Sequence, residues 1–160
     1  MNIAQLKIKA AAKHKENSVF LAKLKQKPPK KLDQIMEGIH EEVFEKTDCL
    51  QCRNCCRTTG PLLLPKDIEI LASHLKMRPG KFMEHYLRVD EDNDTIFKSM
   101  PCPFLGEDNS CSVYEYRPKA CRIFPHTKRK KIYQINHLNI QNVAICPAAF
   151  EVVERLKKII

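Results

Sequence analysis

The cysteines are the residues of this sequence whose types and spacing could do chemistry, and there are eight of them. Four lie within the nine residues 49–57, at Cys49, Cys52, Cys55 and Cys56. With two residues between thiols, a tight turn lets both sulfurs reach one metal ion, at about 2.3 Å for zinc. We therefore predict that this segment is a loop that begins a metal site. The remaining cysteines, which we expect to fold back and complete the site, are Cys102, Cys111, Cys121 and Cys146.

The ligand type limits the metal. Soft thiolates suit zinc, iron-sulfur clusters and copper(I), and the lack of carboxylate clustering near the cysteines disfavours calcium and magnesium. The spacing Cys-x2-Cys-x2-Cys is similar to the opening of the bacterial ferredoxin ligand run, although no further cysteine follows three residues after Cys55. A 4Fe-4S cluster would therefore be completed from a distance, and a thiol-only zinc site is equally allowed.

The adjacent pair Cys55 and Cys56 bears on how the ligands are shared. Successive side chains usually diverge, so we expect one of the two to face a second site or a partner. Eight ligands could make two four-coordinate sites, or one cluster with a separate group of thiols. The spacing does not choose between these arrangements.

Basic and aromatic residues next to the cysteines are candidates for supporting the site. Four thiolates around Zn²⁺ leave a net charge of about −2, which nearby cations would offset. Pairing of the same arginines with surface carboxylates is the alternative. His126, Tyr114 and Tyr116 are candidate proton donors near Cys121, with core packing as the alternative for the tyrosines. The cations in question are Arg53, Arg57, Arg117 and Arg122.

The whole chain has 160 residues, which fits one domain, and its lack of tryptophan predicts an aliphatic core. The first nine residues are interrupted by charge and lack the apolar run of a signal peptide, so we expect a cytoplasmic protein without a membrane span. In a reducing compartment, cysteines act as metal ligands or redox thiols. Four disulfides would be the main rival if the protein were exported.

Positive charge is concentrated at the N-terminus. Residues 1–31 hold nine lysines and one acidic residue, Glu16, a net charge of +8 out of +9 for the chain. We therefore expect a basic, helical N-terminal arm over 1–31, followed by a cysteine-cluster metal-binding domain over 32–160. Such an arm could attract nucleic acid, an anionic membrane or an acidic protein, and a solvated helix face is the alternative.

Hydrophobic periodicity predicts a mainly α fold with little β, a small irregular domain stabilised by metal. The N-terminal helix should end before Pro28-Pro29, and the next should bury Leu32, Ile35, Met36, Ile39 and Val43. We also expect a helix opened by Pro65 and a C-terminal one opened by Cys146-Pro147. The other expected elements are a short helix over 82–87, strands over 95–98 and 132–135, and a strand over 111–114 that pairs back as a hairpin.

Together these residues resemble the CxxCxxCC or YkgJ-like cysteine-cluster family, which is described as a zinc- or iron-chelating domain. The resemblance runs from about residue 46 to 148, and it implies a ligand role for all eight cysteines. Flagellin lysine methylases are similar over the cysteine motif and are regarded as iron-sulfur proteins. We carry over no methylation activity, because the chain has no Gly-x-Gly-x-x-Gly motif. The motifs that carry the resemblance are Cys49-x2-Cys52-x2-Cys55-Cys56, Pro101-Cys102-Pro103-Phe104-Leu105, Cys111-Ser112-Val113-Tyr114, Arg117-Pro118, Cys121-Arg122 and Phe124-Pro125.

Three functions are open at this point. The first is a non-catalytic metal-binding module that holds zinc or an iron-sulfur cluster. The second is an enzyme in which an iron-sulfur cluster does redox or group-transfer chemistry. The third is a zinc-stabilised adaptor that binds nucleic acid or an acidic partner through residues 1–31.

Overall fold

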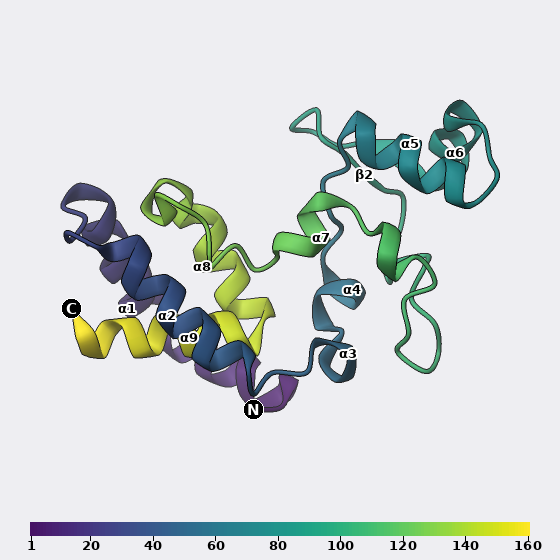
Figure 1. Cartoon of the computed structure of the whole chain (residues 1–160). Coiled ribbons are helices and arrows are strands. Elements are labelled where there is room, and N and C mark those ends of the chain that lie inside the picture. Colours follow the sequence, from purple (N-terminus) through teal and green to yellow (C-terminus); the bar gives the residue numbers. More distant parts are fainter. The chain divides into compact units, whose positions relative to one another are not determined.

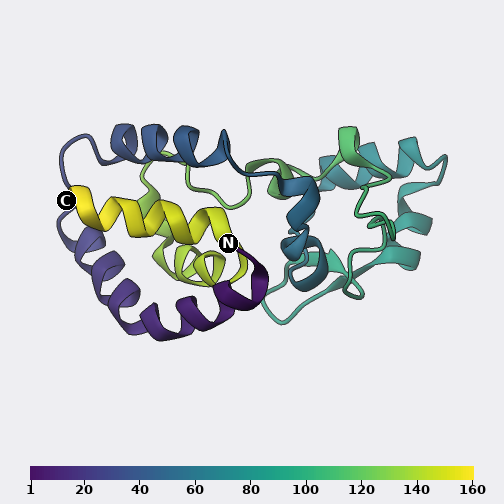
Figure 2. The ribbon, with the colours of Figure 1, turned by 90° about the horizontal axis from the view of Figure 1, so that it is seen from below.

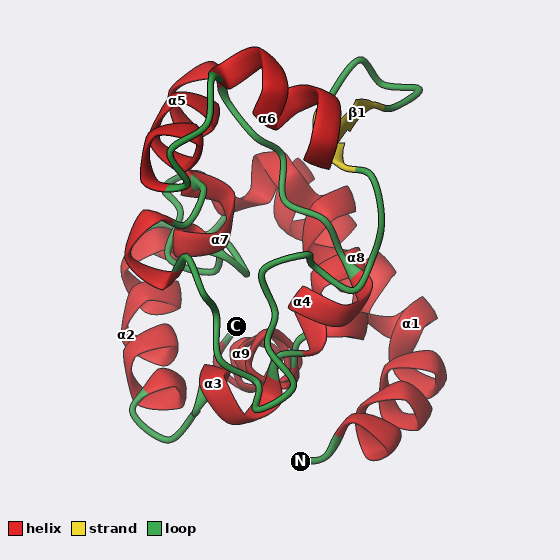
Figure 3. Ribbon diagram, turned by 90° about the vertical axis from the view of Figure 1, so that its right-hand side faces the viewer, coloured by secondary structure: helices red, strands yellow, loops and turns green.

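The computed structural model describes all residues from 1 to 160, and they form two compact units. Unit 1 consists of residues 1–52 and 125–160, so it is built from both ends of the chain, and unit 2 consists of residues 53–124. Nearly all regular structure is helical, with one two-stranded sheet, which confirms the predicted mainly α class (Figure 3). The expected organisation into an arm over 1–31 and a cysteine-cluster domain over 32–160 stays a prediction.

Unit 1 is helical throughout (Figure 1). Its elements are α1 (Ile3–Gln26), α2 (Leu32–Phe44), α3 (Cys49–Cys52), the 3-10 helix η2 (Ile132–Ile135), α8 (Asn136–Ile145) and α9 (Pro147–Ile159).

The basic N-terminal segment is a 24-residue helix, α1, that packs against α8 and α9. It begins with a reciprocal cap, in which Gln5 N donates to Asn2 Oδ1 and Asn2 N donates to Gln5 Oε1. Its buried side chains include Leu6, Leu21 and Leu24, as the sequence predicted. One side of this lysine-rich helix is therefore part of the core of unit 1.

Helix α9 lies between α1 and α2, as Figure 2 shows. The predicted C-terminal helix is α9, which buries Phe150, Val152, Val153 and Leu156 and leaves Ile159 exposed. The α2 side chains Leu32, Met36, Ile39 and Val43 are buried as predicted, and Ile35 is half-buried. Two long amphipathic helices thus bury their stripes against each other.

The strand predicted over 132–135 is wrong, because this segment is η2 and leads directly into α8. Lys131 has a left-handed backbone (φ 54°) that turns the chain into η2. Ile132 and Ile135 are both buried, which fits a 3-10 turn, where residues three apart lie above each other. Alternation in a strand would have put them on opposite faces.

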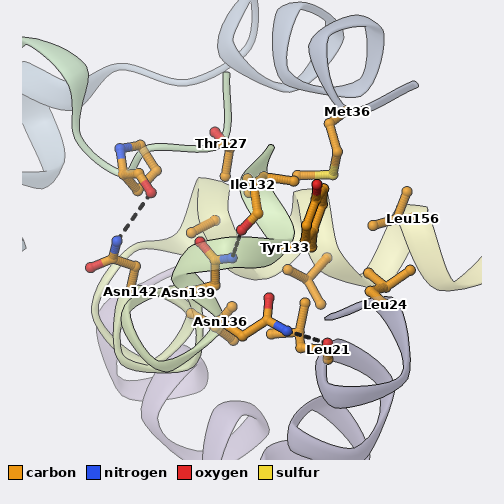
Figure 4. A pocket seen from close by; sticks show the side chains of 14 residues that line it. Leu21, Leu24, Met36, Thr127, Ile132, Tyr133, Asn136, Asn139, Asn142 and Leu156 are labelled. Carbon is orange, nitrogen blue, oxygen red and sulfur yellow. Dashed lines mark hydrogen bonds between the residues drawn. The ribbon is translucent and has the colours of Figure 1, made fainter. Parts of the chain in front are cut away.

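Helix α8, which the sequence reasoning missed, is attached through three asparagines (Figure 4). The side-chain amides of Asn136, Asn139 and Asn142 donate to backbone carbonyls of three other segments. The acceptors are Leu21 O, Ile132 O at 3.1 Å and Pro125 O at 3.1 Å, respectively. The cavity beside them measures about 10 Å³, roughly the room that one water molecule needs. Polar residues on the buried face explain why apolar periodicity did not reveal this helix.

Unit 2 has shorter elements around its own core. They are α4 (Asn54–Thr58), α5 (Pro65–His74), α6 (Pro79–Tyr86), β1 (Leu87–Val89), β2 (Thr95–Phe97), the 3-10 helix η1 (Tyr114–Tyr116) and α7 (Lys119–Ile123).

The core of unit 2 forms where α5 and α6 meet the hairpin, with Leu71, Phe82, Phe97 and Phe104 among its buried residues. Strands β1 and β2 are antiparallel, with Leu87 opposite Phe97. The predicted strand over 95–98 is confirmed in β2, and the predicted helix over 82–87 ends at Tyr86. No helix of the chain has both the length and the apolar character that crossing a membrane requires.

Candidate metal centre

The segment predicted as one loop, 49–57, forms two single-turn helices instead, α3 and α4. Arg53 separates them with a left-handed backbone (φ 45°), and the division between the units falls between Cys52 and Arg53. Asp48 opens α3 by accepting from Leu50 N at 2.8 Å. The first two cysteines of the segment, Cys49 and Cys52, therefore belong to unit 1, and the other two belong to unit 2.

Backbone hydrogen bonds bring three cysteine segments of unit 2 together. Cys102 N donates to Cys56 O at 2.8 Å. Leu105 and Cys111 form an isolated antiparallel bridge, and Ser112 N donates to Phe104 O at 3.0 Å. The predicted hairpin at 111–114 is therefore limited to one bridge and its flanking turn. The result is that the segments carrying Cys56, Cys102 and Cys111 are tied to one another.

A glycine closes the turn between Cys102 and Cys111. A Cβ atom at Gly106 would come within 2.7 Å of Asp108 Oδ1 and 2.9 Å of Ser110 Oγ, so a larger residue would require these two side chains to move. Gly106 N donates to Ser110 O at 2.9 Å across the same turn. This hydrogen bond closes the turn that joins the segment of Cys102 to the segment of Cys111.

The last cysteine of unit 2, Cys121, is positioned by a buried carboxylate that the sequence reasoning missed. Asp67 is 4% exposed, and its Oδ1 accepts from Lys119 N at 2.9 Å, at the start of α7. Its other oxygen, Oδ2, accepts from Leu64 N at 3.0 Å and caps α5. One side chain therefore fixes α7, with Cys121 in it, to α5. An aspartate in the first turn after Pro65 was the available signal.

The thiols of unit 2 lie in one another's electrostatic field. Burial raises the pKa of Cys121 to about 12, and the thiolates of Cys102, Cys56 and Cys111 add to the rise. Burial likewise raises the pKa of Cys102 to about 11, with further contributions from Cys56 and Cys111. The predicted ligands Cys56, Cys102, Cys111 and Cys121 are thus neighbours within unit 2. Repulsion among several thiolates favours a cation among them.

Cys56 differs from the other thiols. A hydrogen bond with the Cys55 thiol, whose Sγ lies 4.0 Å from that of Cys56, lowers the pKa of Cys56 to about 6. Arg53 and Arg57 lower it further, against the effect of burial. Cys56 therefore has the greatest thiolate character among the thiols with a shifted pKa.

Arg53 is a buried cation, with 6% of its surface exposed. Its Nε donates to Asn109 O at 2.8 Å, and its guanidinium carbon lies 5.7 Å from the centroid of the Tyr114 ring. It forms no ion pair with a carboxylate, and its Nη2 is buried without a hydrogen-bond acceptor. A buried charge requires a nearby opposite charge, and the neighbouring thiolates can provide it.

The other predicted arginines divide into two kinds. Arg57 donates to the side chain of Asn109, and Arg117 stacks 3.5 Å from the Tyr114 centroid and favours the thiolate of Cys121. Arg122 is exposed and donates to the carbonyl of Arg117. Three of the predicted cations therefore act on thiols or on the groups around them, and Asn109 is a contact residue that the sequence reasoning missed.

Unit 1 contains three of the predicted ligands, Cys49, Cys52 and Cys146, and the remaining one, Cys55, lies in unit 2. Cys49 and Cys52 are three residues apart in α3 and so share a face of that helix. Cys146 is the N-cap of α9, and the nearby backbone N–H groups of Ala148 and Ala149 act to lower its pKa. Burial raises the pKa of Cys146 to about 11, and the thiolates of Cys49 and Cys52 contribute to the rise.

The predicted proton donors are not gathered in one unit. His126 belongs to unit 1, whereas Tyr114, Tyr116 and Cys121 belong to unit 2. Burial lowers the pKa of His126, with a smaller contribution from Arg129. Tyr116 stacks on His74 with ring centroids 4.0 Å apart, and Tyr114 contacts the arginines described above. The tyrosines thus have packing roles in unit 2.

No disulfide joins any of the eight cysteines. No group of three or more cysteine, histidine, aspartate or glutamate side chains is arranged as a ready-made metal site. The donor chemistry nevertheless fits the metals expected, because both thiol groups consist of sulfur alone and Arg53 supplies a buried positive charge beside one of them. Such sets suit zinc and iron-sulfur clusters rather than calcium or magnesium.

Comparison with known proteins gives one match. No curated protein and no solved structure matches the chain. A family model named CxxCxxCC, with the description "Putative zinc- or iron-chelating domain", matches residues 48–142, which is more than half of the chain. The match covers seven of the eight cysteines, all but Cys146. This protein therefore belongs to the CxxCxxCC family of zinc- or iron-chelating domains.

Proposed function

We propose that the protein is a metal-binding module whose cysteine thiolates hold zinc or an iron-sulfur cluster. The ligands come from the eight cysteines, and the thiol group of unit 2 is the best supported among them. In this reading the bound metal links segments that are far apart in sequence. When bound, zinc supplies a structural cross-link, and an iron-sulfur cluster supplies in addition a centre that can exchange electrons.

The surroundings of Arg53 carry this proposal. Cys56, Cys102, Cys111 and Cys121 influence one another electrostatically, and the guanidinium buried beside Cys56 has no carboxylate partner. A metal bound by four thiolates has a net charge of about −2, so it matches a buried cation. Arg57 and Arg117 extend the positive field on the same thiols. A cluster of neutral thiols without metal would have no charge to offset that of a buried arginine.

The direct test is metal content after anaerobic purification. We expect stoichiometric zinc in a colourless protein, or iron and acid-labile sulfide in a brown one, measured by plasma mass spectrometry, a sulfide assay and the visible spectrum. Protein that folds, as judged by circular dichroism, and holds neither metal would contradict the proposal. The same measurement separates zinc from iron-sulfur without any substitution.

Two adjacent residues provide a matched pair of variants. Cys111→Ser replaces a candidate ligand by its oxygen analogue, so we expect it to reduce the bound metal. Ser112→Ala removes a hydroxyl from the next residue, which is exposed, and should leave the metal content unchanged. Equal metal content in the two variants would remove Cys111 from the ligands.

A further inference from the structure

We propose that the chain holds two separate metal centres, one bound by Cys56, Cys102, Cys111 and Cys121 of unit 2 and the other by Cys49, Cys52 and Cys146 of unit 1. This inference rests on the proposed function, because it divides the same cysteines between two sites. Each set is assembled from the segments of a single unit.

The set in unit 2 supplies a complete group of four thiols. The bond from Cys102 N to Cys56 O and the bridge between Leu105 and Cys111 tie three of the segments together. Asp67 fixes the start of the fourth segment, α7. Four thiolates fill the tetrahedral coordination of zinc and equally provide the four ligands of a cubane cluster. Cys55, whose Sγ lies 4.0 Å from that of Cys56, is not needed to complete this set.

The set in unit 1 is supported by the positions of its cysteines on two helices. Cys49 and Cys52 share one face of α3, and Cys146 caps the 13-residue helix α9. Cys146 lies at the N-terminus of this helix, whose positive end favours an anion at that position. The three thiols are near enough for Cys49 and Cys52 to act electrostatically on Cys146. With three thiols of its own, this set leaves one tetrahedral position for a further ligand.

The break in the cysteine motif is where the two sets part. Arg53, with its left-handed backbone, ends α3 and precedes α4. The spacing of the motif, which looks like a single chelating loop, therefore distributes its cysteines over both units. In this division Cys55 belongs to neither set, and its thiol lies 4.0 Å from that of Cys56.

The test compares three full-length proteins made anaerobically: the natural sequence, Cys121→Ser and Cys146→Ser. We expect two centres per chain in the natural sequence and the loss of about half of the metal in each variant, counted by native mass spectrometry. Ala144→Ser, an exposed change two residues from Cys146, is the control and should keep both centres. A folded variant that loses all its metal, or a natural protein with one centre, would overturn the division.

A second measurement needs no variant, which covers the case in which a serine substitution prevents folding. Metal is withdrawn stepwise from the natural protein with a chelator, and exposed thiols are alkylated and mapped by peptide mass spectrometry. Two centres predict that Cys56, Cys102, Cys111 and Cys121 become reactive as one group and that Cys49, Cys52 and Cys146 become reactive as another. Parallel labelling of all seven would refute the division while leaving metal binding intact. Protein without any metal would refute the proposed function itself.

Discussion

At the scale of single residues, Arg53 places a buried positive charge beside the thiols that we propose as metal ligands. It combines a left-handed backbone, a buried guanidinium and a hydrogen bond to the carbonyl of Asn109. The left-handed backbone costs free energy, and the buried guanidinium costs more wherever no anion compensates its charge. Arginine at this position is therefore best understood together with the thiolates beside it.

Arg53→Met should weaken metal binding. The change keeps much of the side-chain volume but removes the positive charge that offsets the thiolates, so we expect the metal affinity to fall by about 10-fold to 100-fold. Competition with a chromogenic chelator measures the affinity directly. Arg88→Met, the same change at an exposed position of β1, is the control and should match the natural protein. An unchanged affinity in Arg53→Met would show that the guanidinium has no influence on the metal.

Glu154 makes the stability of unit 1 depend on pH. Its carboxylate pairs with Lys13 at 2.9 Å and Lys157 at 2.6 Å. Burial alone would raise the pKa of Glu154, but the hydrogen bonds from the two lysines outweigh it and hold the pKa below the usual 4.5. The ionised form therefore stabilises the fold above about pH 4.5, and this contribution disappears as the pH falls through the lower folded value.

Glu154→Gln should consequently be less stable than the natural protein near neutral pH. The difference should shrink below about pH 4.5, because the natural carboxylate also loses its charge there. Urea unfolding of the metal-free proteins at about pH 7 and about pH 3 measures this. Glu45→Gln, at an exposed position after α2, should show no such difference. A gap between Glu154→Gln and the natural protein that does not change with pH would contradict the assignment.

At the scale of elements, the packing of α1 bears on whether the lysine-rich segment is a detachable arm or part of the core of unit 1. Leu6 is fully buried in a cluster with Phe150 and Val153 of α9. We expect Leu6→Ala to lower the free energy of unfolding of unit 1 by about 2–5 kcal/mol, as measured by urea denaturation. The same change at Ile8, which is 72% exposed, should stay within about 0.5 kcal/mol. A neutral Leu6→Ala would indicate a helix that packs weakly and acts apart from the unit.

The helices with long apolar stripes were predictable from the sequence, and the elements around the cysteines were not. The stripe from Leu32 to Val43 and the C-terminal one through Val153 gave α2 and α9, because burial of one face determines these helices. α3, α4 and α7 are one turn each, too short for any periodicity to register. Their positions depend on tertiary bonds such as the one between Asp67 and Lys119.

The candidate site, too, was predictable from the sequence only in part. The identities of the thiols and of the neighbouring arginines were readable because cysteine spacing and local charge are properties of the sequence itself. The contacts of Asn109 with Arg53 and Arg57 span more than fifty residues, so no local pattern could indicate them. The separation of Cys52 from Cys55 arises from the backbone of one residue, Arg53, in a conformation that sequence reasoning did not foresee.

At the scale of the whole molecule, the two units differ in the interactions that stabilise them. Unit 1 has long helices around two clusters of buried aliphatic side chains. Unit 2 has short elements and a single cluster in residues 53–124. A chain segment of this size buries a smaller share of its surface, so a bound metal contributes a larger part of its stability.

Metal removal should therefore affect the units unequally. After chelation, we expect the amides of residues 53–124 to exchange with deuterium about 100-fold faster, while those of α1, α2 and α9 keep most of their protection. Hydrogen exchange followed by mass spectrometry gives the exchange rates of both units from one sample. Apo protein that has been reloaded with metal serves as the control. Equal loss of protection in both units would mean that the metal stabilises the fold as a whole.

The construction of unit 1 from both ends of the chain has a consequence for biosynthesis. On the ribosome, α1 and α2 emerge before residues 53–124, whereas α9, the helix that packs between them, emerges after those residues. Residues 53–124 are complete before that point, so unit 2 can fold and bind its metal while the N-terminal helices are still waiting for their partner. The order of translation thus allows the inserted segment to take up metal before the surrounding helices close.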